Sequence, residues 1–212
     1  MVVAIDGPAG TGKSTIAKEA ARNTSLYYVN SGNLYRAVTH LCMTQGIDTN
    51  ESSAVLNCLQ QHEIDFLQGK TLIDGQDVDE MLRTDKVDAK VAQVSSIEEV
   101  RNVVNSILRK ISSHTDIIVE GRDMTTVVFP DAEIKIFLDA DAKERAKRRF
   151  DQGTSSLTLE EIEKSIEIRD NIDRNKKIGA LKQAPDAEYL DTSHLTIDEV
   201  CVKVMEIIQR HI

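Results

Sequence analysis

The chain has 212 residues, of which 41% are hydrophobic and 4% aromatic, with no tryptophan and a formal charge of −9. This length suits one medium domain with insertions better than two independent cores. The apolar runs are far shorter than a membrane span requires, so we expect no membrane partner. The acidic balance and the scarcity of aromatic side chains argue against general nucleic-acid binding, which depends on many phosphate contacts and on base stacking.

The three cysteines, Cys42, Cys58 and Cys201, are scattered and show no metal-ligand spacing. They predict reduced thiols rather than a disulfide framework or a structural zinc site. Asp6 follows the start of the chain almost at once, so the N-terminus does not resemble a secretory leader. We therefore expect a cytoplasmic protein.

The first elements alternate between strand and helix. Residues 2–5 form an apolar strand pattern, and a helical pattern follows over Lys13–Arg22. A second strand pattern at 26–29 leads into an amphipathic helix after Ser31. This alternation is typical of an α/β domain with a parallel sheet.

Between residues 63 and 79 the pattern changes. Short strand-like pieces around Ile64 and Leu72 are separated by turn residues, among them Asp74-Gly75, which suits a type I′ hairpin turn. The segment predicts an antiparallel meander of about three strands. Because a meander cannot join a parallel sheet without a crossover, we expect it to form a small lobe of its own.

The pattern then returns to one helix and three strands, at residues 97–111, 117–119, 134–138 and 188–190. Thr158 and Thr196 are each followed three residues later by a glutamate, which is the pattern of a capping box. They predict the N-termini of two further helices.

Residues 7–14 match the phosphate-binding pattern GxxxxGK[ST] in full, between a predicted strand and a predicted helix. The backbone N–H groups of such a loop surround a phosphate at the positive end of the helix. Lys13 would reach the β- and γ-phosphate oxygens, and the Ser14 hydroxyl would be a Mg²⁺ ligand. The ATP site is expected to comprise Gly7, Pro8, Ala9, Gly10, Thr11, Gly12, Lys13, Ser14 and Thr15.

Other P-loop classes fit less well. GTPases need a DxxG and an NKxD element, but the chain has no DxxG, and its only similar segment, NKKI at 175–178, lacks the closing aspartate. A transporter-type ATPase would carry an LSGGQ-like segment, which is also absent. The class that remains is that of the small P-loop kinases.

Four arginines lie at loops or helix starts where they could grip an acceptor phosphate by paired hydrogen bonds, namely Arg36, Arg101, Arg122 and Arg169. Arg122 directly follows the strand at 117–119, at the carboxyl end where α/β sheets bind ligands. A kinase that phosphorylates a hydroxyl profits from a general base, whereas a monophosphate has a second pKa of about 6 and is already ionised. Arginines in place of a single carboxylate favour a monophosphate acceptor.

Residues 143–149 are the densest basic run. Arg145, Arg148 and Arg149 share a helix face by their i,i+3 and i,i+4 spacing, and the segment Gly153-Thr154-Ser155-Ser156 then breaks the helix. We expect the basic helix, the loop tip and a second helix to form a lid that closes over the triphosphate.

Several segments beyond the P-loop point to one family. They are IDGPAGTGKS at 5–14, NSGNLYR at 30–36, LRT at 82–84, EGRDMTTVVFPDA at 120–132, RDNIDRN at 169–175 and LDTS at 190–193. In these segments, over nearly its whole length, the chain resembles the bacterial cytidylate kinases. The GRDxxTVVFPDA segment is the most specific, and the meander is similar to the longer monophosphate-binding insert of these enzymes.

The resemblance implies a three-layer α/β P-loop fold with a five-stranded parallel sheet. One kinase domain over 1–212 would contain an antiparallel monophosphate-binding insert at about 37–95 and a helical lid at about 145–178. It implies transfer of the γ-phosphoryl group of ATP-Mg²⁺ to CMP or dCMP in pyrimidine nucleotide metabolism. We expect a monomer whose partners are ATP, CMP and dCMP, without nucleic acid or membrane.

The resemblance also implies roles for single residues. Seven belong to the acceptor: Ser31, Arg101 and Asp123 at the cytosine edge, Arg36 and Arg122 at the phosphate, and Arg169 and Asp173 at the ribose. Asp123 suits its role because a carboxylate accepts from the cytosine amino group, where uracil presents an acceptor. The residues expected to act on the transferring phosphoryl group are Lys13, Arg122, Arg148, Arg149 and Arg169.

The chain departs from the family pattern at several positions. Ala92 stands where a serine near the ribose is usual, and Thr125 replaces a usual glycine. The others are Glu120 for a frequent aspartate, Lys176 and Ile172 for arginines, and Ala180 for a proline. Two alternatives stay open: a P-loop kinase for UMP, AMP or a small hydroxylated metabolite, and a nucleotide-binding regulatory module without turnover.

Overall fold

The computed structural model describes residues 1–153 and 155–211. The chain divides into two compact units, of which the first comprises Met1–Asn30 with Ile111–Ile212 and the second comprises Ser31–Lys110. Within the described residues, no helix is both long and apolar enough to traverse a lipid bilayer.

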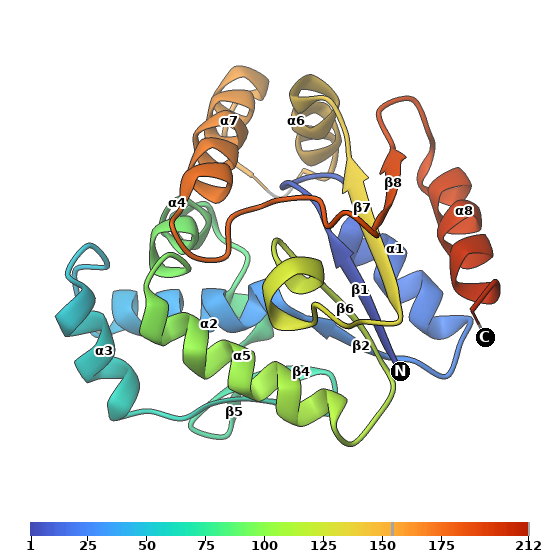
Figure 1. Cartoon of the computed structure of the whole chain (residues 1–212). Coiled ribbons are helices and arrows are strands. Elements are labelled where there is room, and N and C mark those ends of the chain that lie inside the picture. The colour runs from blue at the N-terminus through green and yellow to red at the C-terminus, as the bar shows by residue number, and fades with distance from the viewer. Residues whose placement is uncertain (154, 212) are drawn as a thin grey trace. The chain divides into compact units, whose positions relative to one another are not determined.

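The first unit is built on a five-stranded sheet in the order β2-β6-β1-β7-β8 (Figure 1). The strands are β1 (Val2–Asp6), β2 (Tyr27–Asn30), β6 (Ile117–Gly121), β7 (Ile134–Asp139) and β8 (Glu188–Asp191). Neighbouring strands pair in parallel throughout, which confirms the predicted five-stranded parallel sheet. In the central pair the last residue of β1, Asp6, lies opposite Gly121 of β6.

Helices α1 (Lys13–Arg22) and α8 (Ile197–Gln209) cover one face of this sheet (Figure 1). Alternate residues of β1, Val3 and Ile5, point into that layer and are fully buried with Ile16 of α1 and Val204 of α8. Burial of side chains of this size contributes about 1.5–3 kcal/mol each. The predicted capping box at Thr196 is present and begins α8.

Helices α6 (Ala142–Asp151) and α7 (Leu159–Asn175) lie side by side (Figure 1). Their shared core consists of Ala146 from α6 and Ile162 and Ile166 from α7. The predicted capping box at Thr158 is confirmed. The loop tip expected at 153–156 includes Thr154, which lies outside the described residues.

The second unit holds a separate antiparallel sheet in the order β3-β4-β5, which confirms the predicted meander. Its elements are α2 (Ser31–Thr44), α3 (Ser52–Gln60), β3 (Ile64–Leu67), β4 (Lys70–Ile73), β5 (Gln76–Asp77), the 3₁₀ turn η1 (Asp79–Met81), α4 (Asp85–Val94) and α5 (Glu98–Ser112), whose last two residues belong to the first unit. Asp74 and Gly75 both have positive φ, as the predicted type I′ turn requires. The expected insert at 37–95 falls within this unit, and its role toward a monophosphate stays a prediction.

Candidate active site

The P-loop joins the end of β1 to the start of α1. Gly7 has a φ of 151°, and a Cβ there would lie 2.0 Å from the carbonyl oxygen of Leu138 on β7, so only glycine fits. Gly12, at the N-cap of α1, has a φ of 89° and offers no side-chain cap. The first N–H groups of α1 are therefore left for an anionic ligand, as the motif predicts.

Lys13 is folded back onto its own loop. Its side chain is buried, and its ammonium group donates to the carbonyl of Pro8 at 2.6 Å and to the hydroxyl of Thr11 at 3.2 Å. Burial holds the pKa of Lys13 well below its usual range, and the positive charge of Arg122 lowers that pKa further. The anionic oxygens of a triphosphate would favour the charged ammonium and replace the loop oxygens as acceptors.

Ser14 lies at the end of a chain of polar side chains in the first unit. Its hydroxyl is 3.5 Å from the Asn30 amide nitrogen, which donates to the Tyr28 hydroxyl at 3.1 Å. Tyr28 in turn donates to the carboxylate of Glu120 at 2.7 Å, at the end of β6. Burial and the neighbouring carboxylate raise the pKa of Tyr28, so it stays a hydrogen-bond donor. This series of side chains therefore connects Ser14 of the P-loop to the Glu120 carboxylate.

Arg122 follows β6 directly and belongs to a dense ionic cluster. Its Nε donates to Asp173 of α7 at 2.8 Å, and Lys176 and Arg169 approach the same carboxylate at 3.3 and 4.0 Å. Burial raises the pKa of Asp173, but the three positive charges outweigh burial and hold that pKa well below its usual range. The structure thus brings together Arg122, Arg169 and Asp173, with Asp173 as the counter-charge of the cluster.

Asp123 comes next and is buried, with 1% of its surface exposed. A short π-helical turn, η2 (Met124–Val128), starts directly after it. The Arg122-Asp123 pair is thereby held between the end of β6 and a turn that packs against β1.

The other three acceptor residues belong to the second unit. Arg36 forms an ion pair with Asp88 of α4 at 2.8 Å. Arg101 is buried, donates to the carbonyl of Ser95 at 3.2 Å and lies over the Tyr35 ring, 5.6 Å from its centre. The remaining member, the first residue of α2, Ser31, is also buried.

The basic run lies on α6, and two of its arginines contact different segments of the first unit. Arg145 is buried and donates to the carbonyl of Ala9 in the P-loop at 2.9 Å and to Asp170 of α7 at 2.6 Å. Arg148 instead hydrogen-bonds Thr192 and Leu195, in the segment after β8. The reason is that backbone carbonyls of different loops of the first unit lie around α6 and accept from successive arginines. The roles of Arg148 and Arg149 at the phosphates stay predictions.

Comparisons with known proteins identify the family of the chain. The sequence model of the family described as Cytidylate kinase matches residues 3–210. The chain belongs to the cytidylate kinase family. The protein named Cytidylate kinase 1 of Borreliella afzelii is 40% identical over 211 residues, which cover 97% of this chain and 96% of that protein. The Cytidylate kinase of Lactobacillus johnsonii is 43% identical over 218 residues, which cover 99% of this chain and 94% of that protein.

One solved structure shows the same fold at low sequence identity. It is an uncharacterized protein from Eubacterium ventriosum, with a TM-score of 0.57 and 10% identity over 99% of this chain and 98% of that one. At that identity the likeness concerns the fold alone.

Some contacts in this member of the cytidylate kinase family were not expected from its sequence. The main ones involve Asp6, which binds the turn after Asp123, and Arg145, which binds the P-loop. A signal for Asp6 was present, because a carboxylate that ends an otherwise apolar buried strand needs donors nearby. No local signal marked Arg145 apart from its neighbours in the basic run.

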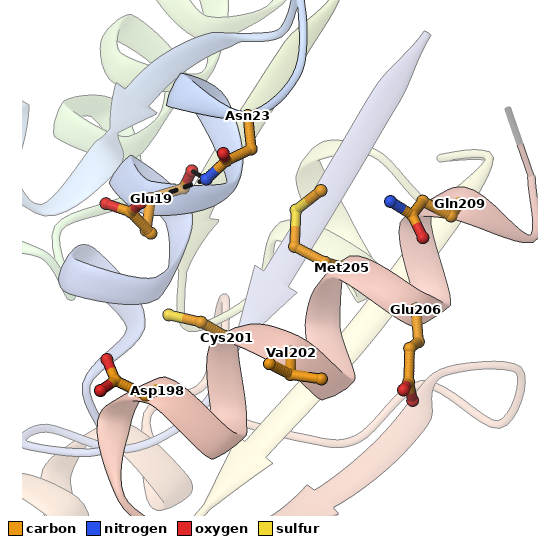
Figure 2. Close-up of a pocket in the computed structure, with 8 residues that line it drawn as sticks. All are labelled: Glu19, Asn23, Asp198, Cys201, Val202, Met205, Glu206 and Gln209. Carbon is orange, nitrogen blue, oxygen red and sulfur yellow. Dashed lines mark hydrogen bonds between the residues drawn. The ribbon is translucent and has the colours of Figure 1, made fainter.

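A groove lies near the C-terminal end of α1, opposite to the end that follows the P-loop (Figure 2). It is lined by Glu19, Asn23, Asp198, Cys201, Val202, Met205, Glu206 and Gln209. Its lining carries three carboxylates and no lysine or arginine, so its charge opposes an anionic nucleotide. The groove therefore does not compete with the P-loop as the nucleotide site.

Proposed function

We propose that this chain transfers the γ-phosphoryl group of ATP to CMP or dCMP, giving ADP and CDP or dCDP by direct in-line transfer. The observation that carries the proposal is the pairing of β1 with β6, in which Asp6, the residue before the P-loop, lies opposite Gly121, the residue before Arg122 and Asp123. The donor and acceptor residues thus begin at neighbouring strand ends in a chain of the cytidylate kinase family.

On the donor side, residues 7–15 would hold the phosphates of ATP by backbone N–H groups at the start of α1. Lys13 would place its charge on the β- and γ-phosphate oxygens, where negative charge develops during transfer. Arg148, Arg149 and Arg169 would add positive charge from the lid, about 145–178, when it closes. The direct contact of Arg145 with the P-loop supports a connection between α6 and the donor site.

The residues around Ser14 fit Mg²⁺. This cation prefers oxygen ligands. Water molecules and substrate phosphates usually supply several of those ligands. The Ser14 hydroxyl would be a direct ligand, and the nearby charge of Glu120, connected through Tyr28 and Asn30, favours a cation there. A cation held there would neutralise part of the negative charge of the ATP phosphates.

On the acceptor side, Arg122 and Arg36 would grip the monophosphate, and Arg169 and Asp173 would contact the ribose. The Asp173 carboxylate orders Arg122 before the acceptor binds, because it holds the guanidinium Nε at 2.8 Å. The acceptor needs no general base, since its second pKa is about 6 and the phosphate is ionised at neutral pH.

Base selection would rest on Asp123, with Ser31 and Arg101 at the same edge. A buried carboxylate accepts from the cytosine amino group and is repelled by the carbonyl oxygen that uracil presents there. The insert at about 37–95 would carry the monophosphate side of the site. We further infer that the enzyme works as a monomer in the cytoplasm.

The experiment is an ADP-release assay with ATP-Mg²⁺ and one acceptor at a time: CMP, dCMP, UMP, AMP, GMP and shikimate. We expect CMP and dCMP to give the highest kcat/KM, by about tenfold or more over UMP. A higher value for UMP, AMP or shikimate would favour the alternative kinase, and ATP binding without acceptor-dependent turnover would favour a regulatory module.

A further inference from the structure

The carboxylate of Asp6 is buried next to the P-loop and accepts three hydrogen bonds. Asp6 is the last residue of β1, it directly precedes Gly7, and none of its surface is exposed. One carboxylate oxygen accepts from the Met124 N–H at 2.9 Å. The other accepts from both the N–H and the hydroxyl of Thr125, each at 2.7 Å.

These donors come from the segment that carries the acceptor residues. Met124 and Thr125 are the two residues after Arg122 and Asp123, and they form the first part of η2. The Asp6 carboxylate therefore connects β1, which leads into the P-loop, to the segment that carries Arg122 and Asp123. Short hydrogen bonds to a charged acceptor are roughly twice as strong as neutral ones, so this connection should restrict the movement of the two segments.

The Thr125 hydroxyl supplies the third of these bonds and has a matched neighbour without one. The Thr126 hydroxyl is also buried, but within the described part of the chain it has no hydrogen-bond partner. The two threonines are adjacent on the same turn and differ in whether their hydroxyl reaches Asp6.

We propose that Asp6 and Thr125 form a positioning pair that fixes the Arg122-Asp123 segment relative to the P-loop. The inference rests on the function proposed above, because it assigns the pair a task in aligning acceptor and donor. The Thr125 hydroxyl supports Asp6 as an anion: burial raises the pKa of Asp6 to about 6, and hydrogen bonds from Thr125 and Met124 oppose that rise.

The alignment matters because small displacements of reacting groups cost large factors in rate. With the hydroxyl bond absent, the Asp6 oxygen keeps only backbone donors, and the segment after β6 gains freedom to move. The P-loop itself keeps its glycine geometry and the Lys13 contacts. Loss of the bond should therefore affect the acceptor more than ATP.

The test compares Thr125→Val with Thr126→Val, which remove the same atoms from adjacent positions, and with Thr125→Ser, which keeps the hydroxyl. Melting temperature, kcat, and KM for CMP and for ATP are measured for each. For Thr125→Val we expect kcat/KM for CMP to fall roughly tenfold, through both a lower kcat and a higher KM, because a hydrogen bond to a charge is lost. KM for ATP should change by less than about twofold, and Thr125→Ser and Thr126→Val should stay close to wild type.

The proposal is overturned if folded Thr125→Val has wild-type kcat and KM for CMP, whatever its melting temperature, because the bond would then serve stability alone. It is equally overturned if Thr126→Val loses as much kcat/KM for CMP as Thr125→Val does, or if Thr125→Ser does not retain a kcat/KM close to that of the wild type. If Thr125→Val does not fold, Thr125→Ala gives the same comparison with a smaller side chain. Failure of the proposed function would appear differently, as a wild-type protein without CMP-dependent ADP release.

Discussion

Asp173→Asn tests the ionic cluster that holds Arg122. The Asp173 side chain is almost fully buried and lies 2.8, 3.3 and 4.0 Å from nitrogen atoms of Arg122, Lys176 and Arg169. Asparagine keeps the shape but removes the negative charge, so three nearby cations lose their counter-charge. Removal of one partner from a buried ion pair costs about 3–5 kcal/mol of stability.

The measurement is the melting temperature without nucleotide. For a chain of this size each kcal/mol shifts the melting temperature by about 2–4 °C, so Asp173→Asn should lower it by about 6–20 °C. Asp77→Asn is the matched control, because Asp77 pairs with Lys70 at 2.7 Å in an exposed position. Exposed pairs contribute little, so the control should melt close to wild type. If Asp173→Asn melts no lower than Asp77→Asn, the cluster does not hold Arg122 in the way described.

The stability that Asp173 contributes should depend on pH in a definite direction. Because the pKa of Asp173 is held below its usual value of 3.8, its stabilising contribution is present above that pH and lost as the pH falls below it. The difference in melting temperature between wild type and Asp173→Asn should therefore narrow as the pH is lowered from about 5 toward 2. Asp6, whose pKa is raised to about 6, has the opposite effect but is common to both proteins. A difference in melting temperature that widens as the pH is lowered would contradict the role of Asp173 as the counter-charge of the cluster.

Three further substitutions test the proposed roles. Lys13→Ala should lower kcat by on the order of 10²-fold or more while the protein stays folded, because the lysine charge serves the transferring phosphoryl group, and near-normal turnover would refute the P-loop role. Asp123→Asn should reduce the CMP-to-UMP ratio of kcat/KM by about tenfold or more, and an unchanged ratio would mean that Asp123 does not read the base. Ala92→Ser should lower KM for CMP roughly two- to tenfold with kcat unchanged, because it supplies one hydrogen bond to the ribose. An unchanged KM for CMP would show that another group already makes the hydrogen bond to the ribose. The Ser95 hydroxyl lies near this position and donates to the Ala92 carbonyl at 2.9 Å.

The elements that local patterns determine were predictable. The P-loop sits between β1 and α1 because its glycines take conformations that other residues avoid, and both capping boxes begin helices. Two helices of the second unit, α3 (Ser52–Gln60) and α4 (Asp85–Val94), were not expected. The first has no side-chain cap, and the second begins after Thr84, which caps it but has Val87 in place of the glutamate of a capping box.

The site was predictable as a set of residues and less so as a set of contacts. Spacing predicts which arginines of α6 share a face, but not which carbonyls lie opposite each of them, because those carbonyls belong to distant segments. Arg145 consequently reaches Ala9, whereas Arg148 reaches Thr192. The bonds of Asp6 depend in the same way on the pairing of β1 with β6. Such contacts arise from tertiary structure and have no local signature.

The fate of the γ-phosphoryl group of ATP distinguishes transfer to CMP from simple hydrolysis. The purified protein is incubated with Mg²⁺, CMP and ATP labelled at the γ-phosphate, and the labelled products are separated. We expect the label in CDP when CMP is present, little release as inorganic phosphate, and on the order of 10²-fold slower labelling with Lys13→Ala. Label released as inorganic phosphate at the same rate with and without CMP would contradict phosphoryl transfer to CMP.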